Sequence, residues 1–196
     1  RAAEELGALL RQDVTTLRGA PRADDRRSVG SVVIGTAAAL YQVPDAGLVA
    51  FVDFDSEVFS PSYRAAESSL ATLVRASRLV GGRSRHGSVL VQTRHPDHEV
   101  IVAALRADPS SVSDAEWRRR QLLGFPPAST IAVVGRSGAT EFIARLGRPT
   151  GVQVQGPTDG QWLLRASEPA VLLDALAAVE RPPGDLRLWV DPIRVR

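Results

Sequence analysis

Two aspartates around the end of an apolar stretch are the first residues whose type and spacing could support catalysis. Asp53 lies within the stretch Leu48–Phe54, and Asp55 follows it directly. If that stretch is a strand, both carboxylates stand at its carboxyl end, where one could attack phosphorus and both could hold magnesium. Acidic side chains that are simply solvated at the end of a strand are the simpler interpretation. A magnesium-dependent phosphatase with an aspartate nucleophile is therefore a remote alternative.

Two of the three histidines also lie close together, in the stretch His95-Pro96-Asp97-His98. A metal site is one interpretation, but the third histidine, His86, is nine residues earlier, and no His-Glu-x-x-His helix is present. Proline and aspartate are both favoured where helices begin. We therefore interpret the stretch as a loop that enters a helix, and we assign no metal ligand.

Arginines are distributed unevenly along the chain. The stretch Arg75–Arg94 contains five arginines and no acidic residue, whereas Asp45–Glu67 contains five acidic residues and one arginine. Arginine side chains and the N–H groups of a glycine-containing loop could contact a DNA backbone, independently of base sequence and in a salt-dependent manner. A solvated basic loop is the alternative, and Arg118–Arg120 form a second cluster. Four arginines are our candidate DNA-binding residues: Arg75, Arg78, Arg83 and Arg85.

Composition excludes several kinds of chemistry from this chain. Its 196 residues carry a formal net charge of +2, and all 24 basic residues are arginine. Without lysine there is no Walker A phosphate loop and no Schiff base, and without cysteine there is no disulfide or cysteine-ligated zinc. No apolar run approaches the roughly 20 residues of a membrane span, and no signal peptide opens the chain. We expect a cytoplasmic protein with no membrane partner and assign no catalytic residue.

Strands and helices are expected to alternate in the first part of the chain, at Ala2–Leu10, Val14–Leu17, Ser31–Ile34, Leu48–Phe54, from Pro61 onward, Val89–Gln92 and Val100–Ala107. Such alternation predicts an α/β fold with a mostly parallel sheet. The apolar stretch Leu48–Phe54 is typical of a strand covered on both faces. The helix from Pro61 should bury one stripe of side chains, namely Ala66, Leu70, Leu73 and Val74.

The second part begins after a change in composition near Asp108, so we expect domains at residues 1–108 and 109–196. A helix is predicted over Ser113–Leu123, opened by a capping box of Ser113 with Glu116 and closed by Gly124. The elements after it follow the order βαββαβ, which is that of a ferredoxin-like domain, at Thr130–Val134, Thr140–Leu146, Val152–Gln155, Trp162–Arg165, Pro169–Val179 and Leu186–Val190. The three tryptophans at 117, 162 and 189 are expected in the core.

Four stretches of the chain stand out together: FVDFDSEVFSPSYRAAE (51–67), GSVLVQTRHPDH (87–98), AEWRRRQLLGFPP (115–127) and LRLWVDP (186–192). They resemble segments that read LDADxGLFSPDFRAAER, GEVLIQTxHPxH, ExRRxLGLPPY and VxWxxDVDP in the PriA family of bacterial primosomal replication-restart proteins, which are helicase-like. The order and spacing match from about Val32 onward. The chain resembles an actinobacterial-like, motif-degraded version of the C-terminal part of that family.

This resemblance implies that residues 1–108 are the second, RecA-like helicase lobe and residues 109–196 a small C-terminal domain. The zinc module, the first lobe and its ATP site would belong to upstream parts of the family protein, so no cofactor is assigned to this chain. The implied partners are branched and single-stranded DNA, primosome proteins, the loader of the replicative helicase, and single-strand-binding protein. The family resemblance also implies a monomer associated with the nucleoid.

The chain departs from the family in its helicase motifs. Motif V reads GTQMxxKGxxFPxV in the family and GTAAALYQVP (35–44) here, without the glutamine and the lysine. Aligned backward from Gly87, the two arginines of motif VI become Leu79 and Gly82, with Arg78 and Arg83 one residue away. Arginine fingers contribute several orders of magnitude to the rate of phosphoryl transfer. The segment after Arg165 also lacks the basic residue with which the family holds single-strand-binding protein, which argues against docking of that partner here.

The sequence therefore predicts a replication-restart protein that binds stalled or branched DNA forks and helps reload the replicative helicase, with little or no ATP hydrolysis. An active ATP-dependent 3′–5′ DNA helicase with shifted arginines is the main alternative.

Overall fold

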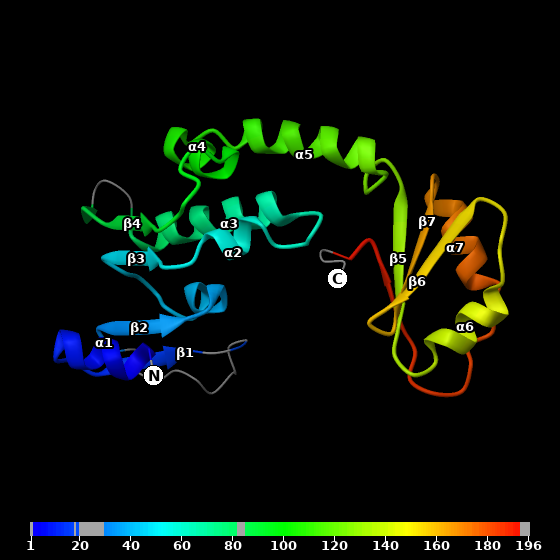
Figure 1. The fold of residues 1–196 in the computed structure, drawn as a ribbon, viewed down its shortest axis with the longest axis horizontal. Helices are drawn as coiled ribbons and strands as arrows, with labels where there is room; N and C mark the ends of the chain where they lie inside the picture. The colour runs from blue at the N-terminus through cyan, green and yellow to red at the C-terminus, as the bar shows by residue number, and fades with distance from the viewer. Residues whose placement is uncertain (1, 18, 20–29, 82–84, 193–196) are drawn as a thin grey trace. The chain divides into compact units, whose positions relative to one another are not determined.

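The computed structural model describes residues 2–17, 19, 30–81 and 85–192. Helices and sheets occur throughout, so the predicted mixed α/β class is confirmed (Figure 1). No helix within these described ranges is both long and apolar enough to cross a membrane.

Contacts divide the chain into two compact units, which we call unit 1 and unit 2. Unit 1 comprises Arg1–Phe59 and Ser68–Pro109, and unit 2 comprises Ser60–Glu67 and Ser110–Arg196. Unit 2 therefore takes in a short segment that comes well before the rest of it in the sequence. The identities expected for residues 1–108 and 109–196, a helicase lobe and a C-terminal domain, stay predictions.

Unit 1 alternates short strands with helices: α1 (Ala2–Leu10), β1 (Val14–Leu17), β2 (Val32–Gly35), the 3₁₀ helix η1 (Ala37–Tyr41), β3 (Leu48–Phe51), α2 (Asp55–Val58), α3 (Ala65–Leu79), β4 (Ser88–Val91) and α4 (Glu99–Arg106). The first turn of α3 belongs to unit 2 and the remainder to unit 1. Strands β1 and β2 form one parallel pair, and β3 and β4 form another. Parallel pairing within unit 1 agrees with the alternation of strands and helices in the sequence.

Strand β3 is shorter and more exposed than its composition suggests. It ends at Phe51, and the chain then turns so that Phe54 is completely buried next to the start of α2. Leu48 remains 60% exposed and Val52 is 74% exposed. The prediction of a strand over Leu48–Phe54 covered on both faces is therefore wrong, because the turn removes its last residues from the sheet and one face lies open within the described residues.

Helix α3 begins at Ala65, four residues after Pro61, which lies outside the helix. The predicted stripe is buried at Ala66, Leu70 and Leu73, and it continues through Ala76 and Leu79 along the same face. The predicted burial of the fourth position, Val74, is wrong, because this side chain lies beside the stripe and is 38% exposed.

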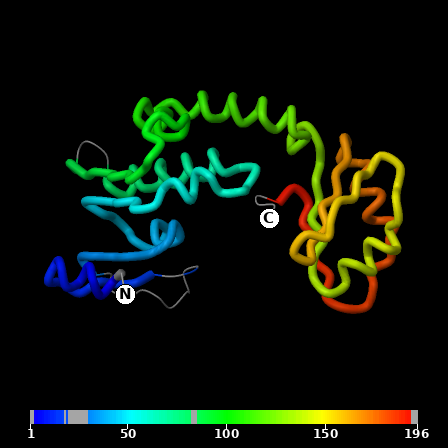
Figure 2. The backbone as a smooth tube through the Cα atoms, viewed as in Figure 1, coloured from blue at the N-terminus to red at the C-terminus, as the bar shows by residue number. Residues whose placement is uncertain are grey.

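Unit 2 contains α5 (Ser110–Leu123), β5 (Thr130–Gly135), α6 (Ala139–Leu146), β6 (Val152–Thr158), β7 (Gln161–Ala166), α7 (Pro169–Ala177) and β8 (Arg187–Val190). After α5 the order is βαββαβ, as the sequence predicts. The four strands form one sheet in the order β6-β7-β5-β8, and every neighbouring pair is antiparallel. Figure 2 shows the last strand, β8, returning beside β5.

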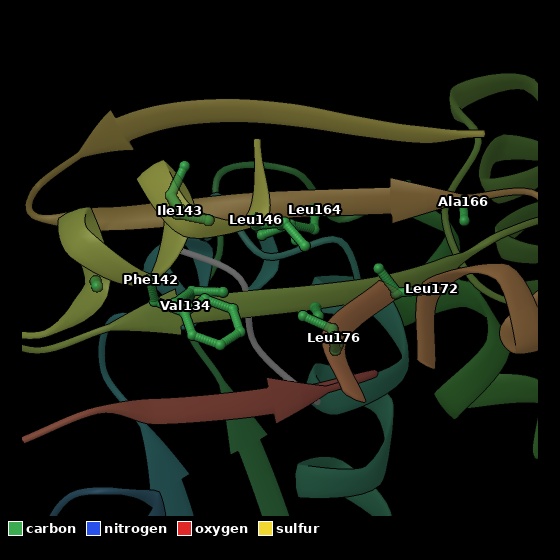
Figure 3. Close-up of a cluster of buried hydrophobic side chains, with 10 residues drawn as sticks. Val134, Phe142, Ile143, Leu146, Leu164, Ala166, Leu172 and Leu176 are labelled. Atoms are coloured by element: carbon green, nitrogen blue, oxygen red, sulfur yellow. The ribbon is translucent and has the colours of Figure 1, made fainter. Parts of the chain in front are cut away.

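The core of unit 2 lies between one face of this sheet and helices α6 and α7. Phe142, Leu164 and Leu172 are completely buried there, and Figure 3 shows their side chains beside those of Leu146 and Leu176. Strand β5 is buried along its whole length, as expected for a central strand. Trp162 packs against this core as predicted, whereas the prediction for Trp117 is wrong. That side chain lies on the outer side of α5 and is 51% exposed.

Helix α5 begins at Ser110, so the predicted capping box at Ser113 is wrong. Its proposed partner Glu116 is instead buried and forms ion pairs with Arg119 and with Arg120, 3.7 Å away in the second case. Arg120 is also buried and forms a further ion pair with Glu67 in the first turn of α3. Burying a guanidinium group is costly unless it is paired, so these ion pairs hold α5 against the segment that carries Glu67.

Aromatic rings and guanidinium groups form a layered stack next to this network. The rings of Tyr63 and Phe125 lie 5.0 Å apart at an angle of 7°. The guanidinium carbon of Arg165 is 5.0 Å from the centre of the Phe125 ring, and that of Arg120 is 5.8 Å from the Tyr63 ring. The Tyr63 hydroxyl donates a hydrogen bond of 2.7 Å to the carbonyl oxygen of Pro192. These contacts explain why the segment that carries Tyr63 belongs to unit 2.

Replacing a leucine in the core of unit 2 should cost far more stability than the same replacement on its surface. Leu164→Ala removes a completely buried side chain, and we expect it to lower the free energy of unfolding by about 2–5 kcal/mol. Leu122→Ala, at a position that is 87% exposed in the same unit, should change it by less than about 0.5 kcal/mol. Urea denaturation followed by circular dichroism measures both values, and similar losses in the two variants would contradict this core.

Candidate nucleic-acid interface

Arg75 joins two segments of unit 1, helix α3 and the 3₁₀ helix η1. It lies in α3, and its Nε donates a hydrogen bond of 3.0 Å to the carbonyl oxygen of Leu40 in η1. Its guanidinium carbon is 5.2 Å from the centre of the Tyr41 ring, which is 66% exposed. An exposed tyrosine beside a partly buried arginine offers both a flat ring and a positive charge. Such a pair can stack on a base and attract phosphate.

The other candidate arginines are less closely connected. Arg78 is an exposed residue in the last turn of α3, and Arg85 is an exposed residue in the connection to β4. Arg83, the fourth candidate, lies outside the described residues. Arg85 is 3.9 Å from a carboxylate oxygen of Asp45. The arginine-rich stretch contains no acidic residue, but in the structure Asp45 lies next to it. The backbone N–H of Ala46 donates a hydrogen bond to the carbonyl oxygen of Leu79, and this bond brings Asp45 to the end of α3.

One of the two positions that the resemblance to the PriA family aligns with motif VI arginines is buried. Leu79 is 5% exposed, and the next residue, Val80, is 3% exposed. An arginine at position 79 would have to bury a charged group in an apolar environment, which is unfavourable without a partner. The second aligned position, Gly82, lies outside the described residues.

Asp55 is held in place by the loop after β4. Its carboxylate accepts hydrogen bonds from the Thr93 hydroxyl at 2.5 Å and from the backbone N–H of Arg94 at 3.0 Å. These two bonds, that of Thr93 first, hold the pKa of the Asp55 carboxyl below its ordinary value, and nearby His95 and Arg94 add to the effect. The carboxylate thus connects the start of α2 with the end of β4. This is a structural role for Asp55, whereas Asp53, two residues earlier, is exposed.

The histidine stretch enters a helix, as the sequence predicts. His98 is the N-cap of α4, and its Nδ1 accepts a hydrogen bond of 3.2 Å from the backbone N–H of Val100. The rings of His95 and His98 lie edge-on to Phe59, with centroids at 4.8 and 5.4 Å. No group of three potential metal ligands exists among the residues that the structure describes.

No protein-family model matches the chain. Residue-by-residue comparison gives several relatives. A stretch of 87 residues is 38% identical to the replication restart protein PriA of Thermotoga maritima, and 98 residues are 34% identical to that of Treponema pallidum. Over 163 residues, 81% of this chain, it is 30% identical to the probable replication restart protein PriA of Mycobacterium leprae. The chain is PriA-like. The resemblance seen in the four sequence stretches is confirmed.

The PriA-like chain spans only a small part of these relatives. The matches cover 43% of this chain and 11% of the Thermotoga protein, and 49% of this chain and 15% of the Treponema protein. The match with the Mycobacterium leprae protein covers 25% of that protein. Activities of a complete PriA therefore come to this chain only as proposals.

Sequence reasoning missed two partners of the candidate arginines in this PriA-like chain. Tyr41 lies in a segment of small apolar residues, 34 positions before Arg75, and nothing in its spacing connects the two. Asp45 belongs to an acidic stretch that is separate from the arginines in the sequence, although it lies beside Arg85 in the structure. The presence of a tyrosine in the stretch GTAAALYQVP (35–44) is the sequence signal for the first contact.

The stability of the chain should depend on Asp55 in acid. Because its pKa in the folded chain is lower than the ordinary 3.8, Asp55 stabilises the fold above that pH, and this contribution disappears as the pH falls through the lowered value. Asp55→Asn should therefore weaken the loss of stability between neutral and acidic pH. Asp53→Asn, two residues earlier and exposed, should leave it unchanged. Thermal melting of the three chains across this range measures the effect, and identical pH profiles would argue against the role of Asp55.

Proposed function

We propose that this chain is part of a replication-restart protein that binds stalled or branched DNA and takes part in reloading the replicative helicase. The observation that carries the proposal is its similarity to several proteins named replication restart protein PriA. Arg75, Arg78, Arg83 and Arg85 are proposed to contact the DNA backbone. The cluster of Arg75 with the exposed Tyr41 supports this, since it offers a charge and a ring on one surface.

Unit 1 is proposed to be the second, RecA-like helicase lobe. Its parallel strand pairs and the helices between them support this assignment. Unit 2 is proposed to be a ferredoxin-like C-terminal domain, which is supported by the βαββαβ order and by the antiparallel sheet with the order β6-β7-β5-β8.

We also propose that ATP hydrolysis is lost or very weak in the protein that contains this chain. The burial of Leu79 supports the loss of the first motif VI arginine, because the side chain packs into unit 1 instead of reaching outward. ATP and zinc would be bound by upstream parts of the complete protein. Exposed Arg78, one residue away, is the feature that favours the alternative of an active 3′–5′ helicase.

The proposed partners are branched and single-stranded DNA, other primosome proteins and the loader of the replicative helicase. Docking of single-strand-binding protein near Arg165 is not favoured, since the guanidinium of this arginine is already engaged with Phe125 and with the carbonyl oxygen of Leu123. The protein is proposed to act as a cytoplasmic, nucleoid-associated monomer.

Reversing the charge of one exposed candidate should weaken binding to forked DNA. Arg78→Glu replaces a favourable phosphate contact by repulsion, so we expect roughly tenfold weaker binding and a salt slope lower in magnitude by about one. Arg106→Glu, in the last turn of α4 of the same unit, is the matched control and should have a much smaller effect. Fluorescence anisotropy with a forked oligonucleotide at several salt concentrations gives both quantities. Equal behaviour of the two variants would refute the assignment.

The complete protein should show no DNA-stimulated ATP turnover. The expectation follows from the contribution of arginine fingers, which raise the rate of phosphoryl transfer by roughly 10³–10⁵-fold. A coupled phosphate-release assay with and without forked DNA measures it. If turnover is stimulated by DNA and abolished by Arg78→Gln, the protein is instead an active helicase whose arginine is shifted by one residue.

A further inference from the structure

Asp45 in unit 1 lies beside Arg85, one of the arginines proposed to contact DNA. Its Oδ2 atom is 3.9 Å from Nη1 of Arg85. The backbone on the carboxyl side of Asp45 is fixed by two hydrogen bonds. The N–H of Ala46 donates to the end of α3 at 3.1 Å, and the start of β4 donates to the carbonyl oxygen of Gly47 at 3.0 Å. The carboxylate is therefore held where the end of α3 and the start of β4 meet the connection before β3.

Arg85 is also held in place, by the glycine on which its side chain lies. Gly81 has a φ of +72°, and a Cβ atom at this position would overlap with Cδ of Arg85, so the aliphatic part of the arginine lies directly on the glycine. The N–H of Gly81 donates a hydrogen bond of 3.2 Å to the carbonyl oxygen of Arg78. Two of the proposed DNA-binding arginines, Arg78 and Arg85, are thus connected through one glycine.

The chain closes tightly on the other side of Arg85 as well. A Cβ atom at Gly87 would overlap with the carbonyl oxygen of Val80, so the backbones at these two positions lie against each other. The guanidinium group nevertheless remains accessible, since the side chain of Arg85 is 66% exposed. Arg85 therefore has a fixed base and an accessible charge.

The pair of Asp45 and Arg85 is a weak ion pair. Its separation of 3.9 Å is longer than a hydrogen bond, and the side chain of Asp45 is 71% exposed. Exposed ion pairs of this kind contribute little to stability. A phosphate group accepts the same charge-assisted hydrogen bonds from a guanidinium group as a carboxylate does. An approaching phosphate can therefore take the place of the carboxylate without disturbing the fold.

We propose that Asp45 competes with DNA phosphates for Arg85 and so restrains binding at this position. The inference rests on the proposed function and concerns the regulation of the same arginines. A phosphate at Arg85 must displace the carboxylate and then remain close to its negative charge, and both effects oppose binding. Contact at Arg85 is consequently weak by itself and is favoured when Arg78 holds a neighbouring phosphate. Asp45 thus makes binding depend on several phosphate contacts that form together.

Removing the charge of Asp45 in the full chain should strengthen binding to a forked oligonucleotide. At low salt we expect Asp45→Asn to bind about two- to fivefold more tightly than the original chain, which is the range that an exposed ion pair accounts for. Its salt slope should be larger in magnitude by up to about one, because Arg85 becomes free for one more phosphate contact. Fluorescence anisotropy at several salt concentrations measures both quantities.

Asp53→Asn is the matched control. It removes the same charge from an exposed position of the same unit, after the end of β3, whereas Asp45 precedes the start of that strand. Because solvent and salt screen a charge that is not in contact with the bound phosphate, this variant should change the affinity by less than about 1.5-fold.

The gain in affinity should also require Arg85. When Asp45→Asn is combined with Arg85→Gln, it should alter the affinity of the Arg85→Gln chain no more than Asp53→Asn does. Equal affinities of the two asparagine variants, or a gain that persists without Arg85, would overturn this inference and leave the proposed fork binding intact. If neither the original chain nor Asp45→Asn binds forked DNA, the proposed function is refuted, and this inference with it.

Discussion

Stacking of guanidinium groups on aromatic rings connects elements in both units of this structure. Every cation in the side chains of this protein, histidine aside, is an arginine. A guanidinium group is planar and weakly hydrated, so it can lie against a ring and still use its edges for hydrogen bonds, whereas an ammonium group cannot. Five such contacts occur among the described residues, made by Arg64, Arg75, Arg120, Arg165 and Arg187.

These contacts organise each unit around an aromatic residue. In unit 1, Arg75 fixes η1 against α3 by holding both a backbone carbonyl and the ring of Tyr41. In unit 2, Arg165 and Arg120 close the two ends of the Tyr63–Phe125 stack. A chain with only arginine as its strong cation can thus use the same group for packing and for anion recognition. One candidate binding residue, Arg75, is therefore also a structural residue.

Local patterns in the sequence predicted the elements of unit 2 well, because each has a clear period and a clear stop. The stretch Val152–Gln155 and its partners alternate as strands do, and Gly124, with Pro126 and Pro127 shortly after it, ends α5 where expected. The start of α5 and the burial of β3 were not predictable in this way. Ser113 and Glu116 have the spacing of a capping box, but Glu116 is buried and forms an ion pair with Arg120. Arg120 also pairs with Glu67, which is far away in the sequence.

The candidate site shows the same limit. The distribution of charge along the sequence is enough to select the four candidate arginines, and four short stretches are enough to show the similarity to PriA. The neighbours of those arginines, Tyr41 and Asp45, come from η1 and from the connection between η1 and β3. Sequence distance gives no information on such pairs, since the parallel strands and the helices between them bring remote segments together.

The stack of Tyr63 on Phe125 also makes unit 2 discontinuous along the chain. The residues from Ser110 onward contain its sheet and helices, but the second ring of the stack and the carboxylate of Glu67 come from Ser60–Glu67. A fragment that begins at Ser110 would lack Tyr63, which covers the ring of Phe125. It would also lack Glu67, one of the carboxylates that pair with the buried Arg120. Recombination that exchanges unit 2 between relatives must therefore transfer both Ser60–Glu67 and the residues from Ser110 onward. Transfer of the second segment alone would combine a sheet and helices from one protein with a Tyr63 and Glu67 segment from the other.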